Sequence, residues 1–451
     1  MVAQLQRIKI IEILDSRGNP TVQVNLRLDQ GTTAIARVPS GASTGGREAV
    51  ELRDDESHRY LGRGVRTVAH NAEAELNNRL AGRPLQEPSD LAALDAELTT
   101  LDGTDRFAHL GANVAVGVSM AAARAIATLH KQPLWQLLHD VLNERVDRIG
   151  AAEHAPRLPV PHFNVINGGA HASNDLPFQE FMIAPLGAPS FADAVRAGAE
   201  IYHRLHAILI ESGDPPGLGD EGGFAPRIDD PTVALDLLVR AIEAAGYTPG
   251  PNQIAIALDP AANGFHHEGG GYDLCGEHYE AGGLIDYYAS LIERYPIWSV
   301  EDGLAEDDWD GWSLLTHRLG SRIQIVGDDI FCTNPQLIKR GIGNGTANAA
   351  LIKVNQIGTV TQTLEAIAQC YRAGWRAMVS HRSGETDDTF IADLAVGAGC
   401  GQLKSGAPAR GERTAKYNRL LEIAADESAT ATFAAWPPPV TRRAGRATRT
   451  A

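Results

Sequence analysis

Acidic residues close three successive apolar runs of the sequence. The runs IAIALD, IWSVED and IQIVGDD place Asp259, Glu301 and Asp328 at their ends. A single acid at the end of a strand most often pairs with an arginine, but three in succession favour a shared set of ligands. Mg²⁺ prefers carboxylate oxygens, so the pattern predicts a site for a hard divalent cation.

Two lysines close later runs of the same kind. Lys353 ends ALIK and Lys404 lies in GQLKSG, in a chain that has only six lysines. A lysine beside other cations can have a lowered pKa and act as a base, whereas one that faces a carboxylate stays charged and clamps a ligand. The residues alone leave open which lysine has which role.

Three further segments carry polar groups that could serve the same site. SHRSGET provides Arg382 and Ser383 as a pair suited to phosphate, and GLGDEGGFAP provides Glu221 as a candidate general acid in a loop that a ligand can approach closely. The G-x-G-x-x-G match that begins at Gly217 is not a dinucleotide motif, because no strand precedes it and no helix follows it. The loop PSGASTGG (39–46) is a plain turn or a lid.

Together these groups suit one reaction class. A cation site, a lysine base, a second lysine, a glutamic acid and a phosphate-binding pair fit removal of a proton α to a carboxylate, followed by loss of a β-leaving group. Such a proton is very weakly acidic, so metal and ammonium charge must stabilise the enolate.

Repeated elements must bring these residues together. The residues Glu301, Asp328, Lys353, His381 and Lys404 follow one another at intervals of 23 to 28 residues, about one strand plus one crossover helix. We count LPVPHFNVINGG and GLGDEGGF as the first two runs of this series. Strands buried on both faces form parallel sheets, so the series predicts an α/β fold with a (β/α)₈ barrel whose strand ends surround one pocket.

The remainder of the chain divides into three parts. Strand-like runs and helical periodicity at 66–81, 90–101 and 111–130 predict a small N-terminal α+β domain. The irregular stretch 143–157 is the expected linker, and the Pro- and Arg-rich tail is expected to be disordered. We therefore expect an α+β domain at 1–143, a barrel domain at 144–424 and a disordered tail at 425–451.

Composition excludes several classes of function. A formal net charge of −16 over 451 residues argues against a nucleic-acid partner. No run approaches the ~18 apolar residues of a membrane span, and the short apolar run near the N-terminus does not suit a signal peptide, so we expect a cytoplasmic protein. The four cysteines lie far apart and are interpreted as small buried apolar residues.

Long motifs of this sequence resemble those of the enolase family. They cover about residues 8–424 and include ILDSRGNPTV, VPSGASTG, NGGAHAS, QEFMIAP, GDEGGFAP, VEDGL, IKVNQIG, SHRSGET and GQLKSGAPAR. The resemblance implies an N-terminal α+β domain and an enolase-type barrel with an irregular start, whose first two strands are antiparallel. It also implies dehydration of 2-phospho-D-glycerate to phosphoenolpyruvate.

By position within these motifs, the resemblance implies chemical roles for five residues. Lys353 would be the base, and Glu221 would be the acid that assists the departure of hydroxide. The first of two Mg²⁺ ions would be held by Asp259, Glu301 and Asp328.

The resemblance likewise implies how the substrate is held. Ser43 would help to bring in the second Mg²⁺ with the phosphate, Arg382 and Ser383 would bind the phosphate, and Lys404 would face the substrate carboxylate. The closed pocket would also be lined by His171, Gln179, Glu180 and His381.

The sequence departs from the family pattern away from these residues. Ile11, Gln23 and Glu422 replace charged residues that pair across the usual dimer interface, and only Glu412 is kept, so a homo-oligomer would have an altered interface. After Asp259 the chain reads PAANGF and then HHEGGG, where the family usually has Ala-Ser-Glu-Phe.

Three alternatives to an ordinary enolase are considered, and the departures favour the first of them. The first is an enolase-like enzyme of phosphonate metabolism, of the carboxyphosphonoenolpyruvate synthase type, and the second is a catalytically retired enolase with a binding role. A racemase or cycloisomerase is disfavoured, because those relatives carry a Lys-x-Lys pair and this chain has none.

Overall fold

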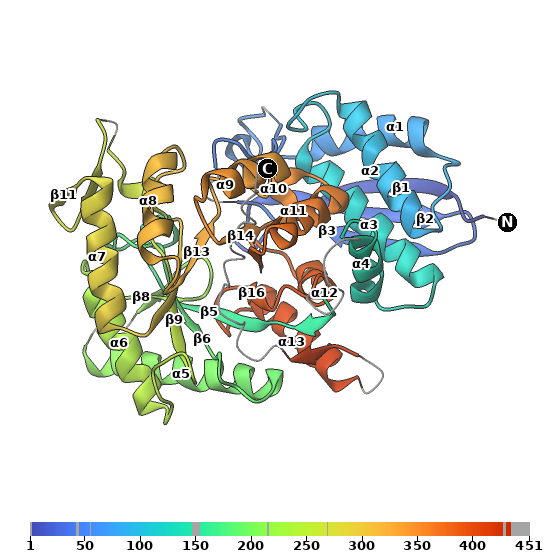
Figure 1. Cartoon of the computed structure of the whole chain (residues 1–451). Coiled ribbons are helices and arrows are strands. Elements are labelled where there is room, and N and C mark those ends of the chain that lie inside the picture. Colours follow the sequence, from blue (N-terminus) through green and yellow to red (C-terminus); the bar gives the residue numbers. More distant parts are fainter. Residues whose placement is uncertain are drawn as a thin grey trace, which may run out of the picture.

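The computed structural model describes residues 2–41, 45–54, 56–146, 154–213, 216–267, 269–426 and 430–433. The predicted α/β architecture is confirmed: a small α+β unit is followed by a closed barrel with helices around it (Figure 1).

The N-terminal unit is an antiparallel sheet covered by helices. Its strands are β1 (Leu5–Leu14), β2 (Pro20–Leu28) and β3 (Thr33–Arg37), in which alternate residues such as Val22, Val24 and Leu26 are buried. The helices are α1 (Arg66–Leu80), α2 (Pro88–Asp102), α3 (Ala112–Leu129) and α4 (Leu134–Asn143). The strands and the first three helices match the sequence prediction.

Helix α3 is the centre of this unit. By length and composition alone it could span a membrane, but 83% of its 18-residue window is buried inside the protein. Its small residues allow the sheet to approach closely, since a Cβ at Gly117 would lie 2.7 Å from a methyl group of Val24. The helix is therefore the core of the domain.

Eight strands form the closed ring of the barrel. In spatial order they are β5 (Val160–Asn167), β6 (Glu180–Ala184), β9 (Ala255–Asp259), β12 (Ile297–Glu301), β13 (Gln324–Gly327), β14 (Ala349–Ile352), β15 (Arg376–Ser380) and β16 (Gln402–Lys404), and β16 pairs with β5 to close the ring. Only β6 runs antiparallel to both of its neighbours. The antiparallel start that the family resemblance implied is thus confirmed.

The outer helices follow the strands in chain order. They are α5 (Phe191–Glu211), α6 (Pro231–Ala244), α7 (Ala281–Arg294), α8 (Trp309–Leu319), α9 (Pro335–Asn344), α10 (Val354–Ile357), α11 (Val360–Arg372), α12 (Phe390–Gly397) and α13 (Gly411–Ala425). Buried apolar residues recur along one side of each long helix, as in α11 with Leu364 and Ile367.

The strand prediction based on the spacing of apolar runs was wrong at the start of the barrel. The run GLGDEGGF forms no ring strand: its residues make the two-residue strands β7 (Gly217–Leu218) and β8 (Phe224–Ala225), a small hairpin beside β5. The second ring strand is β6, which the rhythm alone did not count. A run that is half glycine has too few side chains to be a buried barrel strand.

Three other expectations need correction or fall partly outside the described residues. Thr432–Phe433 forms a strand, β17, that pairs with β4 (Arg157–Leu158), so the predicted tail is not wholly disordered. Residues 147–153 of the predicted linker, and tail residues 427–429 and 434–451, lie outside the described residues. Cys275 is exposed, whereas the other three cysteines are buried as expected.

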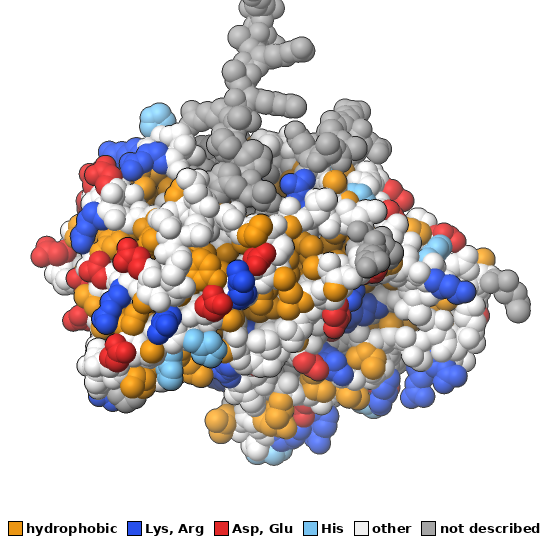
Figure 2. All heavy atoms as spheres, turned by 90° about the horizontal axis from the view of Figure 1, so that it is seen from below, with side chains coloured by type: hydrophobic (Ala, Val, Ile, Leu, Met, Phe, Trp, Pro, Cys, Tyr) orange, Lys and Arg blue, Asp and Glu red, His pale blue; other side chains and the backbone are white. Residues whose placement is uncertain are grey.

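Charged side chains of both signs are scattered over the surface. On the face seen from below in Figure 2, described Lys and Arg side chains alternate with Asp, Glu and hydrophobic ones. This face therefore presents mixed charge rather than a continuous basic surface.

Candidate active site

The carboxyl ends of the parallel strands gather the predicted residues at one mouth of the barrel. Asp259, Glu301 and Lys404 are the last residues of β9, β12 and β16, and Asp328 and Lys353 follow β13 and β14 directly. The reversed strand β6 brings its first residue, rather than its last, to the same mouth, where Glu180 pairs in register with Asp259.

Ten of the predicted residues line one pocket at this mouth. With Ser380, the lining residues are His171, Gln179, Glu180, Glu221, Asp259, Lys353, His381, Arg382, Ser383 and Lys404. Glu301 and Asp328 lie beside it, each bonded to one of the two lysines. Ser43 lies outside the described residues.

Lys404 lies among three carboxylates. Its Nζ is 2.7 Å from Glu301 Oε1, 3.1 Å from Glu180 Oε1 and 3.3 Å from Asp259 Oδ2, and all four side chains are buried. Burial opposes the charge on Lys404, but the surrounding carboxylates raise its pKa well above the ordinary value. Lys404 is therefore a fixed positive charge, which suits a clamp and not a base.

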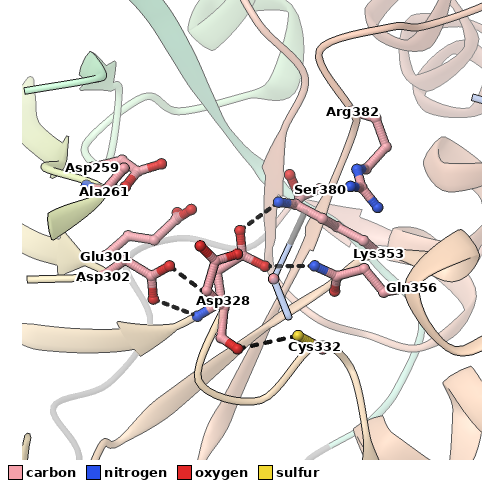
Figure 3. A network of polar contacts seen from close by, with 12 residues as sticks. Asp259, Ala261, Glu301, Asp302, Asp328, Cys332, Lys353, Gln356, Ser380 and Arg382 are labelled. Carbon is pink, nitrogen blue, oxygen red and sulfur yellow. Dashed lines mark hydrogen bonds and ion pairs between the residues drawn. The ribbon is translucent and has the colours of Figure 1, made fainter. Parts of the chain in front are cut away.

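Lys353 contacts the third predicted metal ligand. Its Nζ forms a short ion pair with Asp328, whose other oxygen accepts a hydrogen bond of 2.9 Å from Gln356 (Figure 3). Burial opposes the charge of Lys353, but Asp328 raises its pKa above the ordinary value. While this ion pair persists, the lysine holds a proton and cannot accept another.

Glu221 belongs to a second cluster of buried polar side chains in the pocket and lies in the loop between β7 and β8. Its Oε2 accepts a hydrogen bond of 2.9 Å from Asn164 and lies 3.1 Å from His381 Nε2, while Oε1 lies 3.6 Å from His171 Nδ1. Burial raises the pKa of Glu221, and only positively charged His381 and His171 rings would hold it well below the ordinary value.

Arg382 is paired with a residue of the N-terminal domain. Its two Nη atoms lie 2.9 Å and 3.1 Å from the oxygens of Glu48, and Nη1 also donates to Asn355 Oδ1 at 2.9 Å. Gly45, just after the undescribed residues 42–44, donates its backbone N–H to Glu48 at 3.1 Å. Glu48 thus connects the predicted phosphate arginine to the predicted loop.

The acidic groups at the barrel mouth fit a divalent cation. Glu301 Oε2 is buried and has no hydrogen-bond partner within the described part of the chain. Asp302, Asp328 and Asp329 also offer oxygens that lie within 4.8 Å of one another. Because the available donors are oxygens and one is left unpartnered, the donor set suits Mg²⁺.

Several residues of the site were missed by the sequence reasoning. Asp302 adopts a left-handed φ of 41° and accepts hydrogen bonds from the backbone N–H groups of Asp328 and Asp329, which fixes the end of β13. In the sequence, the position of Asp302 directly after Glu301 was the only feature that could have indicated its role in the site. Glu48 and Gln356 gave none, because a lone polar residue in a loop or helix does not reveal its distant partner.

Comparison with known proteins identifies the family of both domains. A family model described as the enolase N-terminal domain matches residues 5–138, and one described as the enolase C-terminal TIM barrel domain matches residues 155–437.

Individual relatives match along almost their whole length. The chain is 51% identical over 419 residues to the enolase of Mycobacterium leprae, covering 93% of this chain and 94% of the relative. It is 52% identical over 414 residues to the enolase of Rubrobacter xylanophilus, covering 91% and 92%. It is 51% identical over 437 residues to enolase 2 of Pseudomonas syringae pv. syringae, covering 96% and 98%. The chain belongs to the enolase family.

Proposed function

We propose that this chain dehydrates 2-phospho-D-glycerate to phosphoenolpyruvate, with Lys353 as the base and Glu221 as the acid. The observation that carries the proposal is that both residues line one pocket, together with the arginine and serine suited to phosphate. The relatives named enolase support this substrate, and the phosphonate and retired-enzyme alternatives gain no support of their own.

The substrate is held by charge from two sides in this proposal. Arg382 and Ser383 bind the phosphate, and Lys404 faces the carboxylate with its fixed positive charge. His171, Gln179, Glu180 and His381 enclose the remainder of the pocket and exclude water from it.

The proton transfers then take place at two named atoms. Lys353 Nζ accepts the proton from the α-carbon, and Glu221 donates a proton to the departing hydroxyl group, which leaves as water. If Asp328 were shared with a cation, its negative charge would stabilise the charge of Lys353 less, which would favour the neutral form of the base.

We propose two Mg²⁺ ions for the complete site. Asp259, Glu301 and Asp328 would hold the first, and Ser43 would contribute to the second together with the substrate phosphate. Mg²⁺ supplies positive charge that stabilises the enolate form of the substrate carboxylate.

Assays of three variants test these roles separately. We expect the wild type and the surface control Lys339→Ala to reach a kcat/KM of about 10⁴ M⁻¹ s⁻¹ or more with Mg²⁺. Lys353→Ala should lose both dehydration and exchange of the α-proton with D₂O. Glu221→Gln should lose dehydration but keep the exchange, because only the second transfer is blocked. Retained exchange in Lys353→Ala would exclude Lys353 as the base.

We also propose a cytoplasmic homo-oligomer whose interface differs from the usual one. Ile11 is 36% exposed, Gln23 bonds within its own sheet to Asn25, and Glu422 lies 3.3 Å from Arg419 of its own helix. Light scattering would distinguish an oligomer from a 48.2 kDa monomer.

A further inference from the structure

Arg413 is a buried arginine that the proposed chemistry does not use. It lies in the first turn of α13 with its side chain fully buried. Its Nη1 donates to the carbonyl oxygen of Arg382 at 2.6 Å, and Nη2 donates to those of Ser383 at 2.6 Å and Asp220 at 3.0 Å. Nε lies 3.4 Å from Glu412.

The fifth contact of Arg413 determines where His381 carries its proton. Nη1 lies 2.5 Å from His381 Nδ1. A guanidinium group can only donate, so Nδ1 must accept and cannot carry a hydrogen. Burial lowers the pKa of His381 to about 3, so the ring is neutral and its single hydrogen is on Nε2.

The Nε2 atom lies close to the proposed catalytic acid. His381 Nε2 is 3.1 Å from Glu221 Oε2, the oxygen that also accepts the hydrogen bond from Asn164. Oε2 therefore has the donor nitrogens of two N–H groups within 3.1 Å and is disfavoured as a site for a third hydrogen. The other oxygen, Oε1, lies 3.6 Å from His171 Nδ1 and accepts no hydrogen bond from the described part of the chain.

We propose that Arg413 is a positioning residue that fixes His381 as the Nε2–H tautomer and thereby confines the catalytic proton of Glu221 to Oε1. The inference rests on the proposed role of Glu221 as the acid. Without Arg413, His381 can carry its hydrogen on Nδ1 and present a lone pair at Nε2. Glu221 would then carry its proton on Oε2 and donate it to His381, away from the substrate.

The tautomer can be measured without any substrate. In wild-type protein labelled with ¹⁵N-histidine, we expect His381 to show an unprotonated Nδ1 and a protonated Nε2, with the signal assigned by its loss in His381→Gln. Arg413→Lys retains a donor and should keep this pattern, whereas Arg413→Met should lose it. A wild-type His381 with its hydrogen on Nδ1 would overturn the proposal even if Arg413→Met does not fold.

Kinetics separate positioning from a merely structural role. Arg413→Met should lower kcat by about 10²-fold or more, in the range for general acid catalysis. In His381→Gln the side-chain amide can still donate an N–H but has no tautomer, so adding Arg413→Met there should lower kcat less than about 3-fold. Equal losses in both backgrounds would refute the proposal.

A matched control comes from the same helix. Arg419 forms a two-pronged ion pair with Asp393, at 2.8 Å and 2.9 Å. Arg419→Met should leave the His381 spectrum and kcat unchanged, and a change as large as that in Arg413→Met would mean that α13 acts only as a scaffold. A wild type that does not dehydrate 2-phosphoglycerate would instead refute the proposed function, while the spectrum still tests the tautomer.

Discussion

Replacing Glu48 with glutamine tests the link between the two domains at the phosphate site. The Glu48 carboxylate accepts hydrogen bonds from both Nη atoms of Arg382, from Gln356 at 3.2 Å and from the backbone of Gly45. The side chains of Arg382 and Glu48 are only 3% and 8% exposed. The substitution therefore removes a countercharge to which water has little access.

The size of the effect follows from this burial. Removing one partner of a buried ion pair costs roughly 3–5 kcal/mol, because the other charge stays buried without compensation. Asn355 still accepts from Arg382, so we expect the lower end of that range, about 3 kcal/mol. A bound phosphoryl group brings negative charge to the same guanidinium, so ligand should restore at least half of the loss.

Urea unfolding with and without ligand measures both parts of this prediction. We expect Glu48→Gln to lose about 3 kcal/mol of unfolding free energy in buffer with Mg²⁺ alone, and less than half as much with a saturating, equilibrated mixture of substrate and product. Asp286→Asn is the control, since Asp286 pairs with Arg318 at 2.8 Å but with side chains 74% and 41% exposed, and it should cost below about 1 kcal/mol. The reasoning fails if ligand leaves the loss in Glu48→Gln unchanged.

Three further predictions concern stability. Arg124→Met should lower the free energy of unfolding by about 3 kcal/mol near pH 7, because Asp388 loses the guanidinium group that donates to it at 2.6 Å and 2.7 Å. Urea unfolding should show a smaller loss of stability at low pH, where Asp388 is protonated. An equal loss at both pH values would contradict this prediction. Burial lowers the pKa of His162 to about 4, so its contribution to stability is complete above about pH 6.5 and declines as the pH falls toward 4. Between pH 7 and pH 5, the unfolding free energy of His162→Gln should therefore fall by about 2 kcal/mol less than that of the wild type. Parallel pH profiles of stability for the two proteins would refute the lowered pKa of His162. Chelating divalent cations should leave the chain folded, because Lys404 already neutralises part of the acidic cluster. The melting temperature should rise with added Mg²⁺. A melting temperature that does not depend on Mg²⁺ would argue against the proposed metal site.

Strand ends were predictable from the sequence because each is marked locally. Asp259, Glu301 and Asp328 each close an apolar run, and parallel strands bring such ends together whatever their separation in the chain. The position of Lys404 at the end of another barrel strand, β16, could be foreseen in the same way. Its enclosure by three carboxylates could not, because this depends on how far each strand extends and on the register of β6.

Contacts between distant segments were beyond the sequence reasoning. Glu48 and Arg382 are separated by 334 residues and belong to different domains, and no local pattern marks either as the partner of the other. Arg413 was overlooked because it lies on a helix rather than at a strand end. The reversed direction of β6 leaves no trace in the apolar rhythm, and it was expected only from the family resemblance.

The enclosure of Lys404 has a consequence for how tightly the protein retains a divalent ion. An entering ion meets oxygens of Asp259 and Glu301 that already have an internal cationic partner, so part of the attraction is offset by the loss of those two contacts. The net affinity is lower than that of the same carboxylates without a lysine. A site of this kind would fill and empty with the supply of free ion, so its occupancy would follow the ionic conditions around the protein.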